Sequence, residues 1–405
     1  MNAELINFAE RLGRSISQQD NSFAFNGPAL ELFGLQFKHN PAYRRIAEVR
    51  GLTPETVRHW TEVPFVPAVA FKELELSCIS PDKRTAVFHS SGTTVQKPSR
   101  HFHCAESLAL YEASLWKAFE ENVMGPVVGT ARCAVRAACS GATSAFAVPT
   151  HEPLSRRAHV DHSARSAWAG TAQRAVPTTP DYDLLVLAPH PRLMPRSSLV
   201  HMFETVRQKL AAPETVFVGE LDACGAWVIH FDAALAALRA NRRPKLILGT
   251  AFSFVHLVDF LAEMGLRLPM PDGTRVMETG GYKNRSRTMP KTELHSLITE
   301  FLGVPREQII CEYGMSELSS QAYDAGNAGR CFHFPPWARA LIVSPETGRE
   351  AAEGEPGLIR IFDLANVFSV AAIQTEDLGV RRGDGFELIG RAAPAEPRGC
   401  SLMTA

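Results

Sequence analysis

The 405-residue sequence predicts an α/β fold built around a substantially parallel sheet. Short apolar runs each end in a small or polar loop, and segments with helical periodicity, such as 254–264 and 291–302, lie between them. The runs are TAVFHSSGTT (85–94), DYDLLVLAPH (181–190), PKLILGTAFSF (244–254), TRVMETGG (274–281) and EQIICEYGMSE (307–317). In such folds ligands bind where strands end at their carboxyl edge, so we expect the site at these polar loops.

Changes in residue pattern and composition divide the chain into four predicted regions. Residues 1–85 are predicted to be helical and irregular, and they begin with an amphipathic helix in MNAELINFAERLGRS. Residues 86–325 carry the alternating strands and helices. Residues 326–391 consist of short β-like runs separated by turns, which predicts a small β subdomain. Residues 392–405 are rich in Ala and Pro and predict a mobile tail.

Composition and charge exclude several classes of protein. Apolar residues make up 45% and charged residues 21% of the chain, which is typical of a well-packed globular protein. The 42 basic and 43 acidic side chains nearly cancel, so nucleic acid and anionic membranes are not expected as main partners. No apolar run approaches the roughly 18 residues of a membrane span, and the charged N-terminal segment does not resemble a secretory signal.

The cysteines predict a reducing, cytoplasmic location. The chain has 8 of them, with no C-x-x-C pair and no regular spacing, so we expect mostly free thiols and no structural zinc site. His101, His103 and Cys104 fall close together, and an extended segment would place both histidines on one face. Because no second pair of ligands accompanies them, ordinary polar positions beside a loop are the favoured interpretation.

The first segment that can carry chemistry is HSSGTT at 89–94, with Lys97 and Arg100 shortly after it. Its backbone N–H groups, hydroxyl groups and nearby cations suit a polyphosphate ligand. The spacing differs from that of a Walker loop. Taken alone, an ordinary turn explains this loop better.

The second segment is EYGMSE at 312–317, directly after the apolar run QIIC. Its aromatic ring could stack on a base, while its hydroxyl and carboxylate groups could hold a phosphate oxygen and Mg²⁺. Taken alone, a strand end with a capping pattern is slightly favoured.

The third segment is QTEDLG at 374–379, followed by Asp384-Gly385-Phe386 and Gly390-Arg391. A carboxylate and a guanidinium group there could bind both hydroxyls of a ribose. The pair Asp384-Gly385 is also a common hairpin turn, and we expect that turn here.

In their order and spacing, these segments together resemble the adenylate-forming superfamily of acyl- and aryl-activating enzymes. That superfamily has a Ser-Gly-Thr-Thr phosphate loop, then Tyr-Gly-x-Thr-Glu, then Thr-Gly-Asp with a later Gly-Arg. This chain has Ser316 in place of Thr and Glu376 in place of Gly, and Thr279-Gly280-Gly281-Tyr282 matches an upstream Gly-Gly segment. The strings SSGTT…KPSRH, ETGGYKNRSR, CEYGMSELSSQ and RGCSL more closely resemble the long-chain acyl-protein synthetase (LuxE-like) family, from about residue 60 onward.

The resemblance implies a layered adenylate-forming core with a small β subdomain, without the usual mobile C-terminal domain and its catalytic lysine. It implies ATP and Mg²⁺ as cofactors. The phosphates would be bound by Ser90, Ser91, Gly92, Thr93 and Thr94, with charge added by Lys97 or Arg100. The rest of the nucleotide would contact Tyr313 and Gly314 beside the adenine, Ser316 at the α-phosphate, Gly280, Gly281 and Tyr282 on the adenine side, and Asp377 and Arg391 at the ribose. Glu317 would hold Mg²⁺.

Two further residues bear on activity. Val95 stands where the superfamily's phosphate loop continues with Gly, and a β-branched residue does not easily take positive φ. The loop therefore follows a different path, or the site is partly impaired. Cys400 matches a cysteine that, in the resembled family, takes the acyl group from AMP as a thioester and hands it to a partner reductase. Arg398 would favour its reactive thiolate. The alternative is an incidental cysteine in a tail.

The resemblance therefore implies ATP-dependent activation of a carboxylic acid, fatty by analogy, to acyl-AMP and then transfer to Cys400 for delivery to an acyl-acceptor protein such as an acyl reductase. One alternative is a ligase that passes the acid to coenzyme A or a carrier protein. Another is a degenerate nucleotide-binding protein, which Val95 favours and the retained charges of the second and third segments oppose. Phe252 and Phe254 could wall an acyl pocket, although such a pair is more often plain core.

Overall fold

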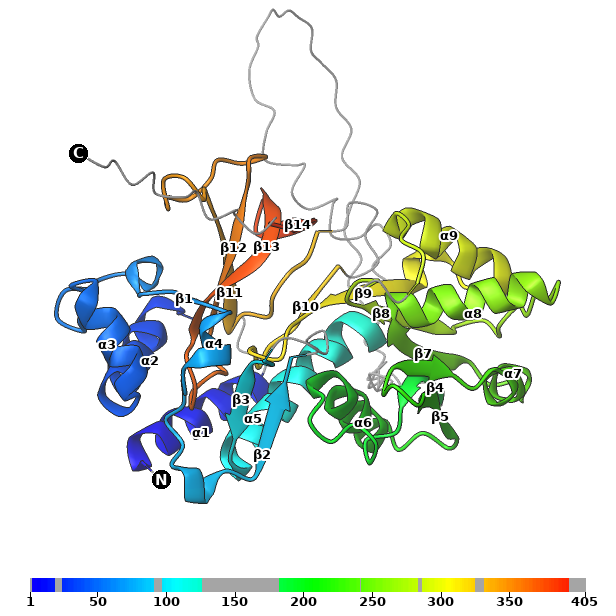
Figure 1. Cartoon of the computed structure of the whole chain (residues 1–405), viewed down its shortest axis with the longest axis horizontal. Coiled ribbons are helices and arrows are strands. Elements are labelled where there is room, and N and C mark those ends of the chain that lie inside the picture. Colours follow the sequence, from blue (N-terminus) through cyan, green and yellow to red (C-terminus); the bar gives the residue numbers. More distant parts are fainter. Residues whose placement is uncertain are drawn as a thin grey trace, which may run out of the picture. The chain divides into compact units, whose positions relative to one another are not determined.

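Figure 1 presents a computed structural model of the chain. It describes residues 2–18, 24–90, 97–125, 182–240, 242–282, 286–324 and 331–392, and the structural statements below concern these residues alone. The predicted tail beyond residue 392 lies outside them, as does most of the predicted phosphate loop.

The α/β core contains a seven-stranded sheet in the order β10-β9-β8-β7-β4-β5-β6 among the described residues. Its strands are β4 (Asp183–Pro189), β5 (Thr215–Leu221), β6 (Trp227–Ile229), β7 (Lys245–Thr250), β8 (Arg275–Thr279), β9 (Ile309–Tyr313) and β10 (Ala322–Tyr323). The strands from β9 to β5 pair in parallel, and β6 and β10 are antiparallel additions at the edges. The predicted substantially parallel sheet is confirmed.

Helices cover both faces of this sheet, which explains why its inner strands are mainly apolar and buried on both faces. Leu185 and Ile247 share a core with the helices α7, α8 and α9, whereas Leu184 and Leu246 face the core that contains α5 and α6. The helices are α5 (Ala105–Phe119), α6 (Ser198–Leu210), α7 (Phe231–Arg239), α8 (Ala251–Glu263) and α9 (Lys291–Leu302). The periodicity predicted for 291–302 coincides with α9. Phe254 lies in the core itself.

The apolar run at 85–94 differs from the other four, because its strand is not part of the large sheet. Strand β2 (Ala86–His89) pairs antiparallel with β3 (Arg100–His103) in a separate two-stranded sheet. A short connection suffices for an antiparallel return, whereas a parallel neighbour requires a crossover of a dozen or more residues. His101 and His103 lie on one face of β3, as expected, but both are buried rather than beside a loop.

A second sheet is formed by β11 (Ala338–Val343), β12 (Pro356–Asp363), β13 (Ala372–Arg382) and β14 (Gly385–Arg391), with β1 (Val66–Pro67) parallel to β13. Arg382 pairs with Gly385, so the hairpin turn is Gly383-Asp384. The predicted turn at Asp384-Gly385 is therefore wrong by one residue. Gly383 has φ +62°, a conformation that a type II′ turn requires at its first position and that glycine adopts without strain.

The N-terminal helices pack against this second sheet in one hydrophobic core (Figure 1). The predicted amphipathic helix is α1, which buries Leu5, Phe8, Leu12 and Ile16 at helical spacing. The helices are α1 (Ala3–Gln18), α2 (Asn26–His39), α3 (Pro41–Val49) and α4 (Ala70–Glu73), and further helical turns lie at Trp60–Glu62, Pro81–Lys83, Glu120–Met124 and Arg306–Gln308. The division of the chain into four regions remains a prediction. Within the described part of the chain, the helices are too short or too polar to cross a membrane.

Candidate functional site

The second segment leaves the carboxyl end of β9, where ligands of parallel sheets usually bind. Gly314 begins this departure, and a Cβ atom at that position would overlap Glu312 Oε1 and press on Gln321 Cγ. Only glycine therefore fits there without a shift of the buried carboxyl group. Beyond Gly314, both Ser316 and Glu317 are buried.

Ser316 and Glu317 form a hydrogen-bonded group with residues of β3 and the segment before it. Ser316 Oγ donates to Glu317 Oε2 at 3.0 Å, and Ser99 Oγ lies 3.4 Å from Ser316 Oγ. His101 Nδ1 lies 2.9 Å from the carbonyl oxygen of Ser316. Burial raises the pKa of Glu317, while its hydrogen bonds from serine hydroxyls and the charge of Lys72 act in the opposite direction. The group can donate hydrogen bonds to a polar ligand, and it can also place the carboxylate of Glu317 beside that ligand.

This group connects to the first segment through Ser99. The backbone N–H of Ser99 donates to Ser90 Oγ at 3.0 Å, and the N–H of Ser90 donates to the carbonyl of Ser99 at 3.4 Å. Ser90 is the residue at which the predicted phosphate loop begins. The structure thus brings the start of the first segment and the second segment together.

The remaining predicted phosphate-binding residues are placed differently. Ser91, Gly92, Thr93 and Thr94 lie outside the described residues, as does Val95. Lys97 Nζ lies 3.3 Å from Glu73 Oε2, and both side chains are more than half exposed. The guanidinium group of Arg100 lies 5.7 Å from the ring centroid of Phe102. Phosphate contacts of these residues remain predictions.

Tyr313 connects the second segment to the third. Its hydroxyl group donates to Asp377 Oδ2 at 2.9 Å, and Arg391 Nε lies 3.4 Å from Asp377 Oδ1. Asp377 and Arg391 are direct partners in the register of β13 and β14. The ring of Tyr313 packs among aromatic neighbours, with its centroid 5.4 Å from that of Phe386, and burial raises the pKa of Tyr313. Asp377 therefore contacts both the hydroxyl group of Tyr313 and the largely exposed guanidinium group of Arg391, and the binding of a ribose by Asp377 and Arg391 stays a prediction.

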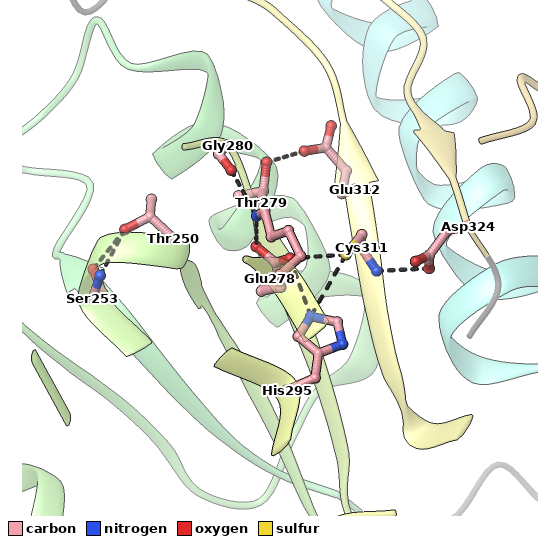
Figure 2. Close-up of polar contacts among 10 residues, drawn as sticks. Thr250, Ser253, Glu278, Thr279, Gly280, His295, Cys311, Glu312 and Asp324 are labelled. Atoms are coloured by element: carbon pink, nitrogen blue, oxygen red, sulfur yellow. Dashed lines mark hydrogen bonds and ion pairs between the residues drawn. The ribbon is translucent and has the colours of Figure 1, made fainter. Parts of the chain in front are cut away.

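The predicted Gly-Gly segment follows β8, next to the second segment. Thr279 Oγ1 donates to Glu312 Oε2 and so links β8 to β9 (Figure 2). The carbonyl of Gly280 accepts a hydrogen bond from Lys291 Nζ at 2.9 Å. Tyr282 Oη is buried and has no hydrogen-bond partner in the described part of the chain, and a Cβ atom added at Gly281 would meet open space. The contact of Gly280, Gly281 and Tyr282 with the adenine side of a nucleotide stays a prediction.

Sequence reasoning did not identify the residues that hold the turn after Glu317. Asp363 accepts hydrogen bonds from the backbone N–H groups of Ser319 and Ser320, each at 2.8 Å. Asn366 Nδ2 donates to the carbonyl of Glu317 at 2.7 Å. Burial raises the pKa of Asp363 against these bonds. The only sequence signal was that two polar residues interrupt the apolar string FDLANVF. Ser99, also missed, stands in KPSRH, one of the strings that carried the resemblance.

A family model described as acyl-protein synthetase, LuxE, matches residues 191–405, more than half of the chain. The chain belongs to this family. The predicted resemblance is therefore confirmed. The match includes the second and third segments and the residues that bring them together.

Two curated relatives of this acyl-protein synthetase family member carry the name long-chain-fatty-acid–luciferin-component ligase. The protein of Aliivibrio fischeri is 23% identical over 182 residues, which is 42% of this chain and 48% of that protein. The protein of Vibrio harveyi is 23% identical over 186 residues, which is 43% of this chain and 49% of that protein. The chain thus spans about half the length of the curated relatives it matches.

Solved structures of 2-hydroxyisobutyryl-CoA ligase share the fold of this acyl-protein synthetase family member. An open conformation in complex with 2-HIB-AMP and CoA superimposes with a TM-score of 0.58 at 14% identity, covering 90% of this chain and 73% of the ligase. The postadenylation state in complex with 2-HIB-AMP has a TM-score of 0.59 at 14% identity and covers 90% and 66%, respectively. The predicted adenylate-forming core is confirmed as a fold.

Proposed function

We propose that this family member uses ATP to convert a carboxylic acid into an acyl adenylate. One observation carries the proposal: the five residues 313–317 contact the third segment directly and are linked to the first segment through Ser99. At one end, Tyr313 binds Asp377 of the third segment, and at the other, Ser316 meets Ser99, which binds Ser90 of the first. A nucleotide along this stretch would find ribose-binding groups at one end and hydroxyl donors for phosphate at the other.

The chemical task agrees with these residues. A carboxylate oxygen attacks the α-phosphorus of ATP, the bond from that phosphorus to the bridging oxygen breaks, and pyrophosphate leaves. Because the attacking carboxylate is already ionised, no general base is needed. The anionic reactants repel each other, so the protein must align them and neutralise charge. Ser316 would donate to an α-phosphate oxygen, while Asp377 and Arg391 would hold the ribose hydroxyls.

The residues also fit a magnesium ion. Ser99, Ser316 and Glu317 gather hydroxyl and carboxylate oxygens in one buried group, and Mg²⁺ prefers oxygen ligands from one or two carboxylates plus the phosphates of a substrate. A divalent cation beside Glu317 would offset the burial that raises its pKa. When bound, Mg²⁺ would neutralise charge on the phosphates. Glu317 would be its ligand from the protein.

The second half-reaction would place the acyl group on Cys400, which lies outside the described residues. Its thiolate would attack the acyl carbonyl of the adenylate, the bond from that carbonyl to AMP would break, and a thioester would form as AMP leaves. An acyl-acceptor protein, such as an acyl reductase, would then take the acyl group. The family model extends over this residue, and the names of the curated relatives support a long-chain fatty acid as substrate.

The experiment measures the two half-reactions separately on the full chain. Exchange of labelled pyrophosphate into ATP, with a panel of fatty and aryl acids, reports adenylation, and intact mass reports self-acylation. We expect acid-dependent exchange and a mass gain of one acyl chain that hydroxylamine removes. Ser316→Ala and Asp377→Asn should lower the exchange rate.

A matched pair of cysteine variants tests the acceptor. Cys400→Ser should abolish the mass gain and retain the exchange, whereas Cys224→Ser, at an exposed position after β5, should change neither. Exchange without a mass gain in the wild type would transfer the acceptor role to coenzyme A or a carrier protein. A chain that binds ATP but catalyses no exchange with any acid would be a nucleotide-binding protein, and the proposal would be abandoned.

A further inference from the structure

Three potential metal ligands lie close together in the interior of the protein. One directly precedes the Gly-Gly segment in the sequence, and another directly precedes the second segment. Glu278 directly precedes Thr279, the last residue of β8, while Cys311 lies on β9 and His295 on α9 (Figure 2). Their residues are only 0%, 3% and 1% exposed, respectively. One oxygen, one sulfur and one nitrogen atom therefore meet in the interior.

The distances among these atoms are close to those around a zinc ion. Cys311 Sγ lies 3.7 Å from His295 Nε2, and His295 Nε2 lies 3.2 Å from Glu278 Oε1. Tetrahedral zinc, with bonds of about 2.0–2.3 Å, separates its ligand atoms by about 3.3–3.8 Å. The third distance, 2.8 Å from Cys311 Sγ to Glu278 Oε1, is shorter, so the carboxylate would have to move outward by several tenths of an ångström.

Lys291 orients the carboxylate without using the oxygen that faces the cluster. Its ammonium group pairs with Glu278 Oε2 and also donates to the carbonyl of Gly280 at 2.9 Å. The other carboxylate oxygen, Glu278 Oε1, faces Cys311 and His295. Outer groups that fix a ligand in this way are a regular part of metal sites.

We propose that Glu278 Oε1, His295 Nε2 and Cys311 Sγ bind one zinc ion. The thiol loses its proton to solvent as the Zn–S bond forms, and no electron is transferred. A mixed set of thiolate, imidazole and carboxylate selects zinc over Mg²⁺ or Ca²⁺, which prefer oxygen ligands alone. The three residues stand 17 and 16 positions apart along the chain, so no ligand spacing marked them in the sequence.

The position of the cluster indicates what the ion would do. Thr279 and Gly280 follow Glu278 directly, and Glu312 and Tyr313 follow Cys311. Zinc would cross-link β8, β9 and α9 immediately behind the proposed adenine side and so hold that wall in place. Without zinc, the thiol and the imidazole can both donate hydrogen bonds to Glu278 Oε1. A metal-free, hydrogen-bonded cluster is therefore the competing interpretation.

The test uses the full chain, stripped with a chelator and titrated with Co²⁺ as a spectroscopic probe for zinc. We expect one equivalent of Co²⁺ to produce a thiolate charge-transfer band that one equivalent of Zn²⁺ removes. Cys311→Ser should lose the band, whereas Cys104→Ser, at another buried cysteine in front of α5, should retain it. His295→Gln should weaken binding by at least about 100-fold, since even changes to outer groups cost about 10–100-fold.

Several outcomes would overturn the proposal. One is a folded wild-type protein with no stoichiometric band; another is a band that survives in Cys311→Ser. If Cys311→Ser does not fold, His295→Gln decides, and unchanged affinity in that variant refutes the site. Pyrophosphate exchange is measured separately. The zinc site does not rest on the proposed adenylation, so failure of either can be recognised on its own.

Discussion

The buried carboxyl group of Glu312 should make the free energy of unfolding depend on pH. Burial is the main cause that raises the pKa of Glu312 from 4.5 to about 7, against the hydrogen bond from Thr279. Between these values the folded protein keeps a proton that the unfolded chain has released, so its stability falls as pH rises. The span is about 2.5 pH units at about 1.36 kcal/mol each, so Glu312 costs about 3 kcal/mol at pH 8 relative to pH 4.5.

The isosteric variant Glu312→Gln isolates this contribution. Urea unfolding of both proteins at pH 5, 6, 7 and 8, in the presence of a chelator, gives the difference in unfolding free energy at each pH. Part of the effect is already present at pH 5, so we expect the variant to gain on the wild type by about 2–3 kcal/mol across the series. Glu278 does not interfere, because although burial opposes its ionisation, Lys291 and His295 lower its pKa to about 2, and its stabilisation is lost only as pH falls toward that value. A difference that stays constant with pH would refute the reasoning.

Three further variants probe the packing and the surface of the site. Gly314→Ala should destabilise the protein by about 1–3 kcal/mol in urea unfolding, because its Cβ would overlap Glu312 Oε1. The control Gly281→Ala places its Cβ in open space and should not destabilise the protein. Equal losses of unfolding free energy in the two variants would contradict this prediction. Asp363→Ala should cost more than about 3 kcal/mol, since it leaves buried N–H groups unpaired, and thermal unfolding at pH 7 measures it. Arg391→Ala should change stability by less than about 1 kcal/mol, because its side chain is 78% exposed, yet slow pyrophosphate exchange by about tenfold or more. Unaltered exchange would remove Arg391 from the proposed ribose site.

The candidate site was predictable where the ligand-binding chemistry is local in sequence. Tyr313, Ser316 and Glu317 stand within five residues after an apolar run. The resemblance to adenylate-forming enzymes also named Asp377, which contacts Tyr313, and Arg391, which contacts Asp377. Ser99 and Asp363 were not predicted. A serine or aspartate is common in any loop, and what distinguishes these two is burial against a segment more than 40 residues away.

Periodicity and composition determined the elements of the fold. Short apolar runs that end in polar loops predicted β4, β7, β8 and β9, and helical spacing predicted α9 with its observed bounds. These patterns reflect local geometry and the removal of apolar surface from water. The hairpin at Gly383-Asp384 was missed by one residue, since strand register depends on cross-strand pairing and not on the turn residues alone.

Tertiary structure alone decided which distant groups meet. It placed β2 beside β3 instead of in the parallel sheet, and it packed the N-terminal helices and the second sheet around one core. It also brought Glu278, His295 and Cys311 together from two strands and a helix. Such contacts follow from how whole elements pack. The spacing of residues in the sequence does not predict these contacts, because sequence patterns reflect only the local geometry of each helix or strand.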